Sequence, residues 1–275
     1  LSEVIKSTKV DETRYLIISI SPYTFLISLF LRLFGRTPII YLRSDGFGEY
    51  KAILGKIGPY IYQIMFSITA MISNLASCRE YILGSKKGKI LSPSQLDSTW
   101  FKKIKPTEIK KFKLLYVGRI RVEKGIFSLA NLIKNKRDLT LTIVGAEKDT
   151  SYAINQSNIT IKINEKDKNK LIKYYDDHNI FILPSFTEGH PMVVLEALAR
   201  RRPIIIFDEI EHVAENKKGI FVTKRNFLDL FKTLNHIKKN YLRIQKDIRK
   251  NDLPTNKNFI SDLISFIENS NQKNF

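Results

Sequence analysis

The chain has 275 residues, of which 43% are apolar and 27% charged, a composition typical of globular proteins and sufficient for two domains. Cys78 is the only cysteine, which excludes an intramolecular disulfide and a metal site built from several cysteines, and favours a reducing compartment. The net charge of +19 favours phosphate-rich partners. The basic residues are spread along the chain and are not interleaved with the aromatic residues that a single-strand nucleic-acid binder uses. Nucleic acid is therefore not an expected partner.

The first half of the chain is predicted to alternate strands with helices. Short β-branched runs near residues 15–20, 38–43 and 74–77 predict strands, and the apolar segments 23–34 and 50–71 predict helices. Such alternation is typical of βα units around a parallel sheet.

The most apolar stretch, Tyr15 to Leu31, has about the shortest length that could span a bilayer. Pro22 divides it into a strand-like run and a helix-like run, so we expect a buried strand followed by a core-packed helix rather than a membrane span. A secondary hypothesis is that exposed aromatic and basic groups of this helix rest on a membrane surface.

The segment from Lys102 to Lys113 is rich in lysine, contains Pro106 and predicts a linker. The strand pattern then resumes near residues 113–117, 139–144, 159–163, 180–183, 203–206 and 220–222. The sequence therefore predicts an α/β protein with two Rossmann-like, doubly wound domains that face a cleft. The expected domains are 1–108, 109–250 and a terminal helix or tail at 251–275.

The N-terminal domain is predicted to be reduced. A complete first domain of this kind opens with a strand and a glycine-rich turn, whereas the first glycine here is Gly35. We expect one or two βα units to be missing and an exposed apolar edge or patch to remain near the N-terminus. Two explanations stay open: the chain, which begins at Leu1, is truncated, or a naturally reduced domain is completed by a partner or a membrane surface.

Two loops of the second domain predict a site for a diphosphate. Its first strand ends at Gly118-Arg119, and the following helix opens at Lys124-Gly125. Gly118 permits a tight turn, while Arg119 and Lys124 place two cations near a helix N-terminus, which itself favours anions. The next strand ends at Gly145, at the same edge of the sheet.

A second feature predicts a site for a sugar nucleotide. Glu188 lies in the loop that follows a strand, and Glu196 lies in the helix that Pro191 begins. We expect both carboxylates to face a solvent cleft, where one accepts sugar hydroxyls and the other ribose hydroxyls. The amides between them would hold phosphate or glycosyl oxygens.

At these residues the chain resembles the retaining glycosyltransferases of family four, known as glycosyl transferases group 1, which share the two-domain GT-B fold. The resemblance covers roughly residues 112–223, in family order. Its matching elements are Val117-Gly118-Arg119 through Lys124-Gly125, Ile143-Val144-Gly145, Leu183-Pro184-Ser185, the spacing from Glu188 to Glu196, and Arg202-Pro203-Ile204-Ile205.

The resemblance implies a role for each matched residue. Arg119 and Lys124 would bind the diphosphate of the donor and Glu188 its sugar, which makes these three the expected catalytic residues, while Glu196 would bind the ribose. His190 is not expected to act as a general base. The other expected donor-binding residues are Gly118, Gly145, Gly189, His190, Pro191, Met192 and Val193.

No Asp-x-Asp motif occurs, so we expect no metal and no cofactor other than the nucleoside-diphosphate sugar itself. Arg119, Lys124 and helix dipoles would then stabilise the departing nucleoside diphosphate. Asp176, Asp177 and His178 are residue types that bind metals, but we interpret them as structural.

The N-terminal half resembles the family less closely. Family members commonly place a histidine after a middle strand of this domain, and the segment from Tyr41 to Tyr50 has none. Arg43, Asp45 and Glu49 are candidates for the acceptor side, with stabilisation of a turn as an equally good explanation for Asp45.

The sequence and the resemblance together predict a metal-independent, retaining hexosyltransferase-type glycosyltransferase. It would transfer a sugar from a nucleoside-diphosphate sugar to a glycan or lipid-linked acceptor in the biosynthesis of bacterial surface polysaccharide such as lipopolysaccharide. We expect it in the cytoplasm, with peripheral contact at the inner face of the cell membrane as an open alternative. A sugar-nucleotide epimerase of the same fold and a non-catalytic, donor-binding partner of another transferase also remain open.

Overall fold

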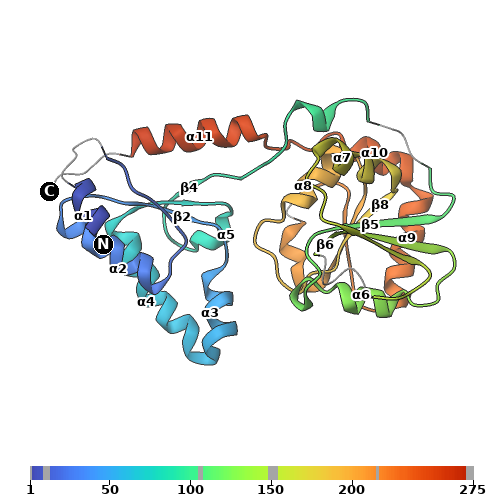
Figure 1. The fold of residues 1–275 in the computed structure, drawn as a ribbon, viewed down its shortest axis with the longest axis horizontal. Helices are drawn as coiled ribbons and strands as arrows, with labels where there is room; N and C mark the ends of the chain where they lie inside the picture. The colour runs from blue at the N-terminus through green and yellow to red at the C-terminus, as the bar shows by residue number, and fades with distance from the viewer. Residues whose placement is uncertain (1, 9–12, 105–107, 148–153, 215–216, 271–275) are drawn as a thin grey trace. The chain divides into compact units, whose positions relative to one another are not determined.

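The computed structural model describes residues 2–8, 13–104, 108–147, 154–214 and 217–270. The chain divides into two compact units, each built around a parallel β-sheet (Figure 1). Unit 1 comprises Leu1–Ser94 and Pro254–Phe275, and unit 2 comprises Gln95–Leu253. The predicted α/β class with two parallel sheets is confirmed.

Unit 1 contains a 4-stranded sheet in the order β1-β2-β3-β4, in which all neighbouring strands are parallel. Its strands are β1 (Leu16–Ile18), β2 (Ile39–Leu42), β3 (Asn74–Ser77) and β4 (Lys89–Ile90). Its helices are α1 (Ser2–Thr8), α2 (Pro22–Leu33), α3 (Gly46–Leu54), the 3-10 turn η1 (Gly55–Ile57), α4 (Gly58–Ile72), α5 (Glu80–Leu83) and α11 (Asn256–Asn269).

The apolar stretch from Tyr15 to Leu31 forms β1 and then α2, as predicted. Ser21 caps α2 by accepting a hydrogen bond from the backbone N–H of Thr24, and Pro22 occupies the first turn, where no donor is needed. Among the described residues, no helix combines the length and the apolar character needed to cross a membrane. Only part of α2 packs in the core, because Tyr23 and Leu33 are 81% and 84% exposed.

The predicted helix at residues 50–71 is wrong as a single element. Gly55 ends α3 with a φ of +63°, and α4 starts at Gly58. A Cβ atom at Gly58 would lie 2.0 Å from the carbonyl oxygen of Tyr50, so the two helices approach too closely there for any other residue.

The expected apolar edge near the N-terminus is present. Among the described strands, β1 lies at the edge of the sheet and pairs with β2, and its Leu16 and Ile18 are 39% and 53% exposed. Residues 2–8 form α1 rather than a further strand. Within the part of the chain that the structure describes, this edge therefore leaves backbone groups of β1 without a strand partner, beside apolar side chains.

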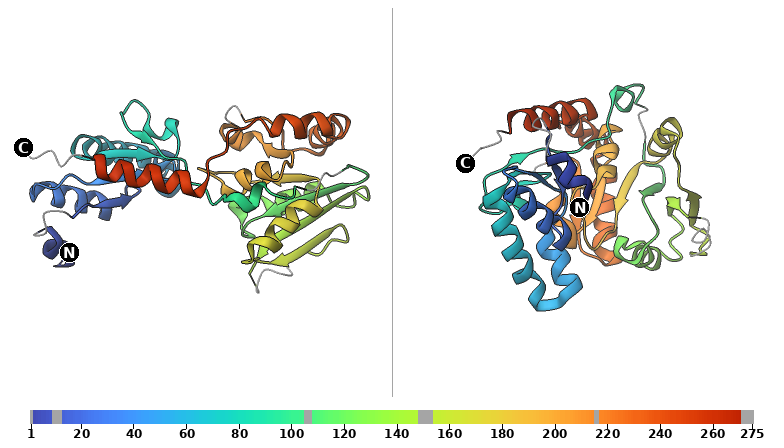
Figure 2. Two further views of the ribbon diagram at one scale, coloured as in Figure 1. Left: turned by 90° about the horizontal axis from the view of Figure 1, so that it is seen from above. Right: turned by 60° about the vertical axis from the view of Figure 1, so that its left-hand side comes forward.

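Helix α11 belongs to unit 1, although it lies at the other end of the sequence. Phe259, Leu263 and Phe266 pack against the core of unit 1, and the rings of Phe259 and Tyr41 have centroids 6.2 Å apart. Figure 2 shows α11 alongside the sheet of this unit. The predicted tail at 251–275 is thus not a separate element.

Unit 2 begins earlier than the predicted boundary at residue 108. The 3-10 turn η2 (Ser98–Phe101) buries Trp100 in the core of unit 2, where its ring meets that of Tyr175 at 5.7 Å. The predicted linker from Lys102 to Lys113 consequently starts on the surface of unit 2, and its residues 105–107 lie outside the described residues.

Unit 2 contains a 6-stranded sheet in the order β10-β9-β8-β5-β6-β7, again with parallel neighbours. The six strands predicted for this half are present: β5 (Phe112–Val117), β6 (Leu139–Ala146), β7 (Ile159–Ile163), β8 (Ile180–Leu183), β9 (Ile204–Phe207) and β10 (Ile220–Thr223). The helical elements are η3 (Val122–Lys124), α6 (Ile126–Leu132), α7 (Lys168–Asp177), α8 (Met192–Ala199), η5 (Asp208–Val213), α9 (Phe227–Lys239) and α10 (Tyr241–Ile248).

The sheet of unit 2 is covered on both faces. Every residue of β8 and β9 is buried, which explains their continuous apolar sequences. Helices α7 and α8 share one face, while α6 and α9 lie on the other (Figure 1). Strand β5 has β6 on one side and β8 on the other, so the carboxyl end of β5 is a topological switch point, the usual place for a ligand in such sheets.

Candidate functional site

The predicted site residues of unit 2 follow the carboxyl ends of β5, β6 and β8. Because all strands of the sheet are parallel, these ends meet at one edge. Backbone and side-chain contacts between the loops show which of the predicted residues come together.

Gly118 and Gly145 lie directly against each other at the ends of β5 and β6. Gly145 has a φ of +127°, and a Cβ atom there would lie 2.4 Å from the carbonyl oxygen of Gly118. The N–H of Gly118 donates to the carbonyl oxygen of Val144 at 2.9 Å. The two glycines therefore let the backbones at the ends of β5 and β6 approach closely.

The loop after β5 presents both predicted cations. Arg119 is exposed, and its carbonyl oxygen accepts a hydrogen bond of 2.9 Å from the hydroxyl of Tyr116. Lys124 lies in η3, which ends at Gly125 in a left-handed conformation with a φ of +65°. A Cβ atom at Gly125 would lie 1.8 Å from the carbonyl oxygen of Pro184, so this turn packs closely on the loop after β8.

An ion pair joins these two loops. Lys124 Nζ lies 2.7 Å from Glu188 Oε1, and Ser185 Oγ donates to the same oxygen at 2.6 Å. The backbone strengthens the junction, because the N–H of Phe186 donates to the carbonyl oxygen of Glu123 at 3.0 Å. Only 10% of the Glu188 side chain is exposed, so its carboxylate is held in one place rather than moving in solvent.

The sequence led us to expect that Glu196 faces a solvent cleft, and this expectation is wrong. Glu196 is 5% exposed and accepts a hydrogen bond of 2.7 Å from the Tyr175 hydroxyl. Burial raises the pKa of Glu196, and the hydrogen bond from Tyr175 partly offsets this shift. Residues 194–199 of α8 are all buried, and the Tyr175 hydroxyl of α7 reaches Glu196 among them.

The residues between the two glutamates form the start of α8. Pro191 is the N-cap residue, and the helix itself begins at Met192. Gly189, His190, Met192 and Val193 are half-buried.

Side chains that the sequence did not single out also hold the Glu188 loop. His212 Nε2, in the segment after β9, lies 2.7 Å from the carbonyl oxygen of Glu188. Arg225, directly after β10, contacts the carbonyl oxygens of Pro184 and Ser185. Their position shortly after strands of the same parallel sheet was the one available signal, because strand order brings those strand ends to this edge.

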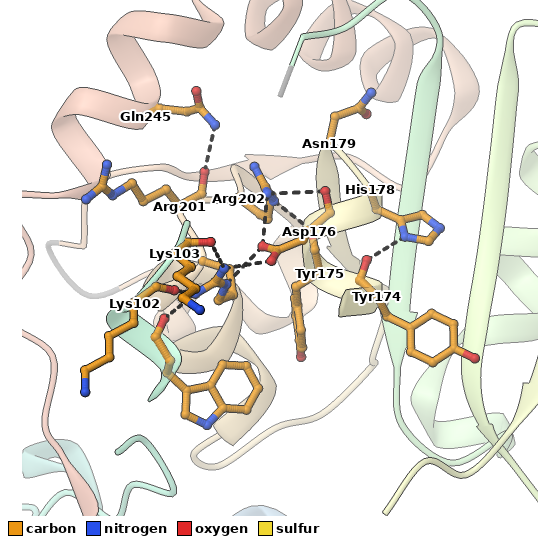
Figure 3. A network of polar contacts seen from close by, with 12 residues as sticks. Lys102, Lys103, Tyr174, Tyr175, Asp176, His178, Asn179, Arg201, Arg202 and Gln245 are labelled. Atoms are coloured by element: carbon orange, nitrogen blue, oxygen red, sulfur yellow. Dashed lines mark hydrogen bonds and ion pairs between the residues drawn. The ribbon is translucent and has the colours of Figure 1, made fainter. Parts of the chain in front are cut away.

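Asp176 and its neighbours have structural partners. Its carboxylate binds Arg200 at 2.7 Å and Arg202 at 3.3 Å, with all three side chains buried (Figure 3). Arg200 also donates to the carbonyl oxygens of Trp100, Lys102 and Lys103, which fixes this segment on unit 2. These ion pairs support the structural interpretation of Asp176.

The neighbouring residues behave in the same way. Asp177 pairs with Lys173 on the surface of α7, and the ring of His178 lies 2.7 Å from Thr142 Oγ1 and 2.6 Å from the carbonyl oxygen of Tyr174. Burial lowers the pKa of His178. Within the described residues, no group of three histidine, cysteine, aspartate or glutamate side chains is placed to hold a metal ion.

The predicted acceptor-side residues lie in unit 1. Asp45 caps α3 by accepting a hydrogen bond of 3.0 Å from the N–H of Phe47, so it has the turn-stabilising role that the sequence left open. Arg43 and Glu49 are exposed.

Comparison with known proteins identifies the family. Residues 98–252 match the family described as glycosyl transferases group 1, and the chain belongs to this family. A proposed teichuronic acid biosynthesis glycosyltransferase of Bacillus subtilis, TuaC, is 34% identical over 94 residues, which cover 34% of this chain and 24% of that protein. The capsular polysaccharide biosynthesis glycosyltransferase CapM of Staphylococcus aureus is 27% identical over 52% of this chain and 41% of its own length. The matched segments thus span less than half of these relatives.

Solved structures show the same fold. HepE of Anabaena in complex with UDP matches with a TM-score of 0.69 and 11% identity, over 96% of this chain and 81% of that chain. Sucrose-phosphate synthase of Thermosynechococcus elongatus matches with a TM-score of 0.66 and 14% identity, over 97% of this chain and 76% of that chain. The fold is GT-B.

Proposed function

We propose that this chain is a retaining glycosyltransferase that moves a hexose from a nucleoside-diphosphate sugar to a glycan or lipid-linked acceptor in bacterial surface polysaccharide biosynthesis. The ion pair between Lys124 and Glu188 carries this proposal, since it places a cation and a carboxylate together at the switch point of the sheet. The UDP bound by HepE and the polysaccharide pathways named for TuaC and CapM support the substrate class.

The donor would change the partners of Lys124. In the structure Lys124 neutralises Glu188, whose carboxylate is almost buried. A diphosphate that enters beside Arg119 competes for the ammonium group, and Glu188 is then free to accept hydrogen bonds from sugar hydroxyls. Arg119 and Lys124 therefore hold the donor first and stabilise the charge of the leaving diphosphate afterwards.

The chemical step needs no protein nucleophile. The bond between the anomeric carbon and the diphosphate oxygen breaks, and the acceptor oxygen bonds to that carbon on the same face. The acceptor proton passes to an oxygen of the leaving diphosphate. The two cations replace the metal that other transferases use to stabilise this leaving group, so we propose a reaction without metal or cofactor.

Unit 1 is proposed to serve the acceptor, with Arg43 and Glu49 as exposed polar groups near the carboxyl end of β2. A cytoplasmic protein with peripheral membrane contact would explain the outer face of α2, which exposes Tyr23, Leu26 and Leu33. Co-sedimentation with vesicles of phosphatidylglycerol tests this contact. Leu26→Glu with Leu33→Glu is expected to abolish binding, and unchanged binding of this double variant would remove α2 from the proposal.

The test of the function is product analysis. The full chain is incubated with a set of nucleoside-diphosphate sugars and with glycan or lipid-linked acceptors, and both products are identified by mass. Transfer lengthens the acceptor and releases a nucleoside diphosphate. An altered sugar nucleotide without release would indicate an epimerase, and donor binding without turnover would indicate a non-catalytic partner. Thermal shifts select the donor beforehand, because a ligand at 100 times its Kd stabilises the folded state by about 2.7 kcal/mol.

A further inference from the structure

Arg225 is the second residue after β10. Its guanidinium lies between two aromatic rings, 4.2 Å from the centroid of Phe186 and 4.2 Å from that of Phe207. Glu209 completes the surroundings, since its carboxylate accepts hydrogen bonds from Nε at 2.7 Å and from Nη2 at 3.0 Å. Stacking and a bidentate ion pair together fix the plane of the guanidinium.

The same group reaches the backbone of the loop that carries Glu188. Nη2 donates to the carbonyl oxygen of Pro184 at 3.0 Å and to that of Ser185 at 3.4 Å. Nη1 points towards the turn after Lys124, because it would lie 3.2 Å from a Cβ atom at Gly125. Arg225 therefore contacts the loop that carries Glu188 and also faces the turn that follows Lys124, so it lies next to both partners' segments of the ion pair.

We infer that Arg225 is a positioning residue of the donor site: it holds the Pro184-Ser185-Phe186 turn so that Glu188 meets Lys124. This inference rests on the proposed function of the same site. The partners of Arg225 in this loop are the two carbonyl groups and the ring of Phe186, and Arg225 acts through them.

Only arginine fits this role. Its planar, forked guanidinium stacks between the two rings while it donates to Glu209 and to the backbone. A lysine at this position keeps the charge, but its ammonium group cannot stack in this way or bind Glu209 through two parallel hydrogen bonds. Arg225→Lys therefore separates the geometry of the group from its charge.

The experiment is a double-mutant cycle in the full chain, with single-turnover kinetics on the donor selected above. Arg225→Met and Arg225→Lys are each made in the parent and in Glu188→Gln. Lys224→Met is the matched control, because it removes a neighbouring exposed cation. Urea unfolding of every variant measures the stability separately.

Arg225→Met and Arg225→Lys are expected to lower kcat/KM by about 10- to 100-fold in the parent, and by less than about threefold in Glu188→Gln, where the group to be positioned is already lost. Lys224→Met should behave as the parent. Equal losses in both backgrounds would overturn the inference, because a merely structural role does not depend on Glu188. Activity of Arg225→Lys like that of the parent would also overturn it.

Arg225→Lys and Glu209→Gln keep the test decisive if Arg225→Met does not fold. Glu209→Gln weakens only the support of the guanidinium and is expected to reduce activity in the same direction by about threefold. Absence of turnover in the parent chain would refute the proposed function, whereas normal turnover in Arg225→Lys and Glu209→Gln refutes the inference alone.

Discussion

Lys124 and Glu188 lie 64 positions apart in the sequence but form an ion pair, with 2.7 Å between Nζ and Oε1. Ser185 shares the same carboxylate oxygen. The pair is the point at which the loops after β5 and β8, which lead to helices on opposite faces of the sheet, are joined by side chains.

Glu188→Gln is expected to lower kcat/KM by about 10- to 100-fold, because the amide neither balances Lys124 nor accepts sugar hydroxyls as a carboxylate does. The fold should persist, since the residue lies in a loop outside the core. Steady-state kinetics and circular dichroism measure the two effects, and Glu268→Gln, exposed on α11, is the control. Near-normal turnover of Glu188→Gln would remove Glu188 from the catalytic site.

Glu196 is expected to make stability depend on pH. Burial raises its pKa above the ordinary value of 4.5, so the folded carboxyl group retains its proton at a pH where the unfolded one has lost it. The free energy of unfolding contributed by this group is fully present below pH 4.5 and falls as the pH rises from there through the raised pKa. Glu196→Gln cannot ionise and avoids this loss.

Urea unfolding between about pH 4 and pH 7 tests this, and the stability of Glu196→Gln relative to the parent should increase with pH. Tyr175→Phe removes the hydrogen bond that lowers the pKa of Glu196. In the chain with Glu196 unchanged, this variant should lose more stability between about pH 4 and pH 7 than the parent does. Parallel curves for the parent and Glu196→Gln would contradict the assignment. Since Glu196 is buried, Glu196→Ala leaves a cavity and is the poorer test of ribose binding.

Gly125→Ala is expected to disrupt both stability and donor binding. A Cβ atom there would lie 1.8 Å from the carbonyl oxygen of Pro184, and the residue has a φ of +65°. Gly55→Ala is a matched control, because Gly55 has a φ of +63° and no atom within 4 Å of the same position. Backbone strain in Gly55→Ala should lower the free energy of unfolding in urea by about 1 to 2 kcal/mol. Gly125→Ala should lower it clearly more. Equal costs would show that the two loops separate easily.

Asp176→Asn is expected to destabilise unit 2 by about 3 to 5 kcal/mol, because Arg200 and Arg202 would remain buried without their shared counter-charge. Asp177→Asn on the same helix removes an exposed ion pair and should cost far less. Urea unfolding compares the two. A small effect of Asp176→Asn would mean that water or the backbone carbonyls compensate both arginines.

Turnover is expected to persist in excess EDTA, since Arg119 and Lys124 are proposed to stabilise the leaving group. The product should keep the anomeric configuration of the donor, which nuclear magnetic resonance of the purified product establishes. Recovery of activity on addition of magnesium would contradict the first statement. An inverted anomeric centre would contradict the second.

The sequence predicted the second sheet well because its strands are buried on both faces and therefore consist of continuous β-branched and aromatic runs, as in β8 and β9. It also predicted that the segments around Lys124 and Glu188 share one edge, since parallel strands bring their carboxyl ends together. The ion pair itself depends on side-chain conformations that no spacing specifies.

The expectations that failed depend on long-range packing. Whether Glu196 faces solvent is decided by α7, which approaches α8 through Tyr175. The helix at 50–71 is interrupted because Gly58 meets the backbone of Tyr50, a contact between two helices that periodicity does not reveal. Arg225 was missed because its partners come from three other places in the chain: Phe186 from the loop after β8, Phe207 from the end of β9, and Glu209 from η5.

The two units differ in when they can be completed during synthesis. Unit 2 is one continuous segment, Gln95–Leu253, whereas the core of unit 1 also needs Phe259, Leu263 and Phe266 from α11. A chain that emerges from the ribosome can therefore fold unit 2 while the apolar surface of β2 and its neighbours still lacks its last helix. During that interval unit 1 is the half that requires protection from aggregation, and a stop codon shortly after residue 253 would leave it permanently in that state.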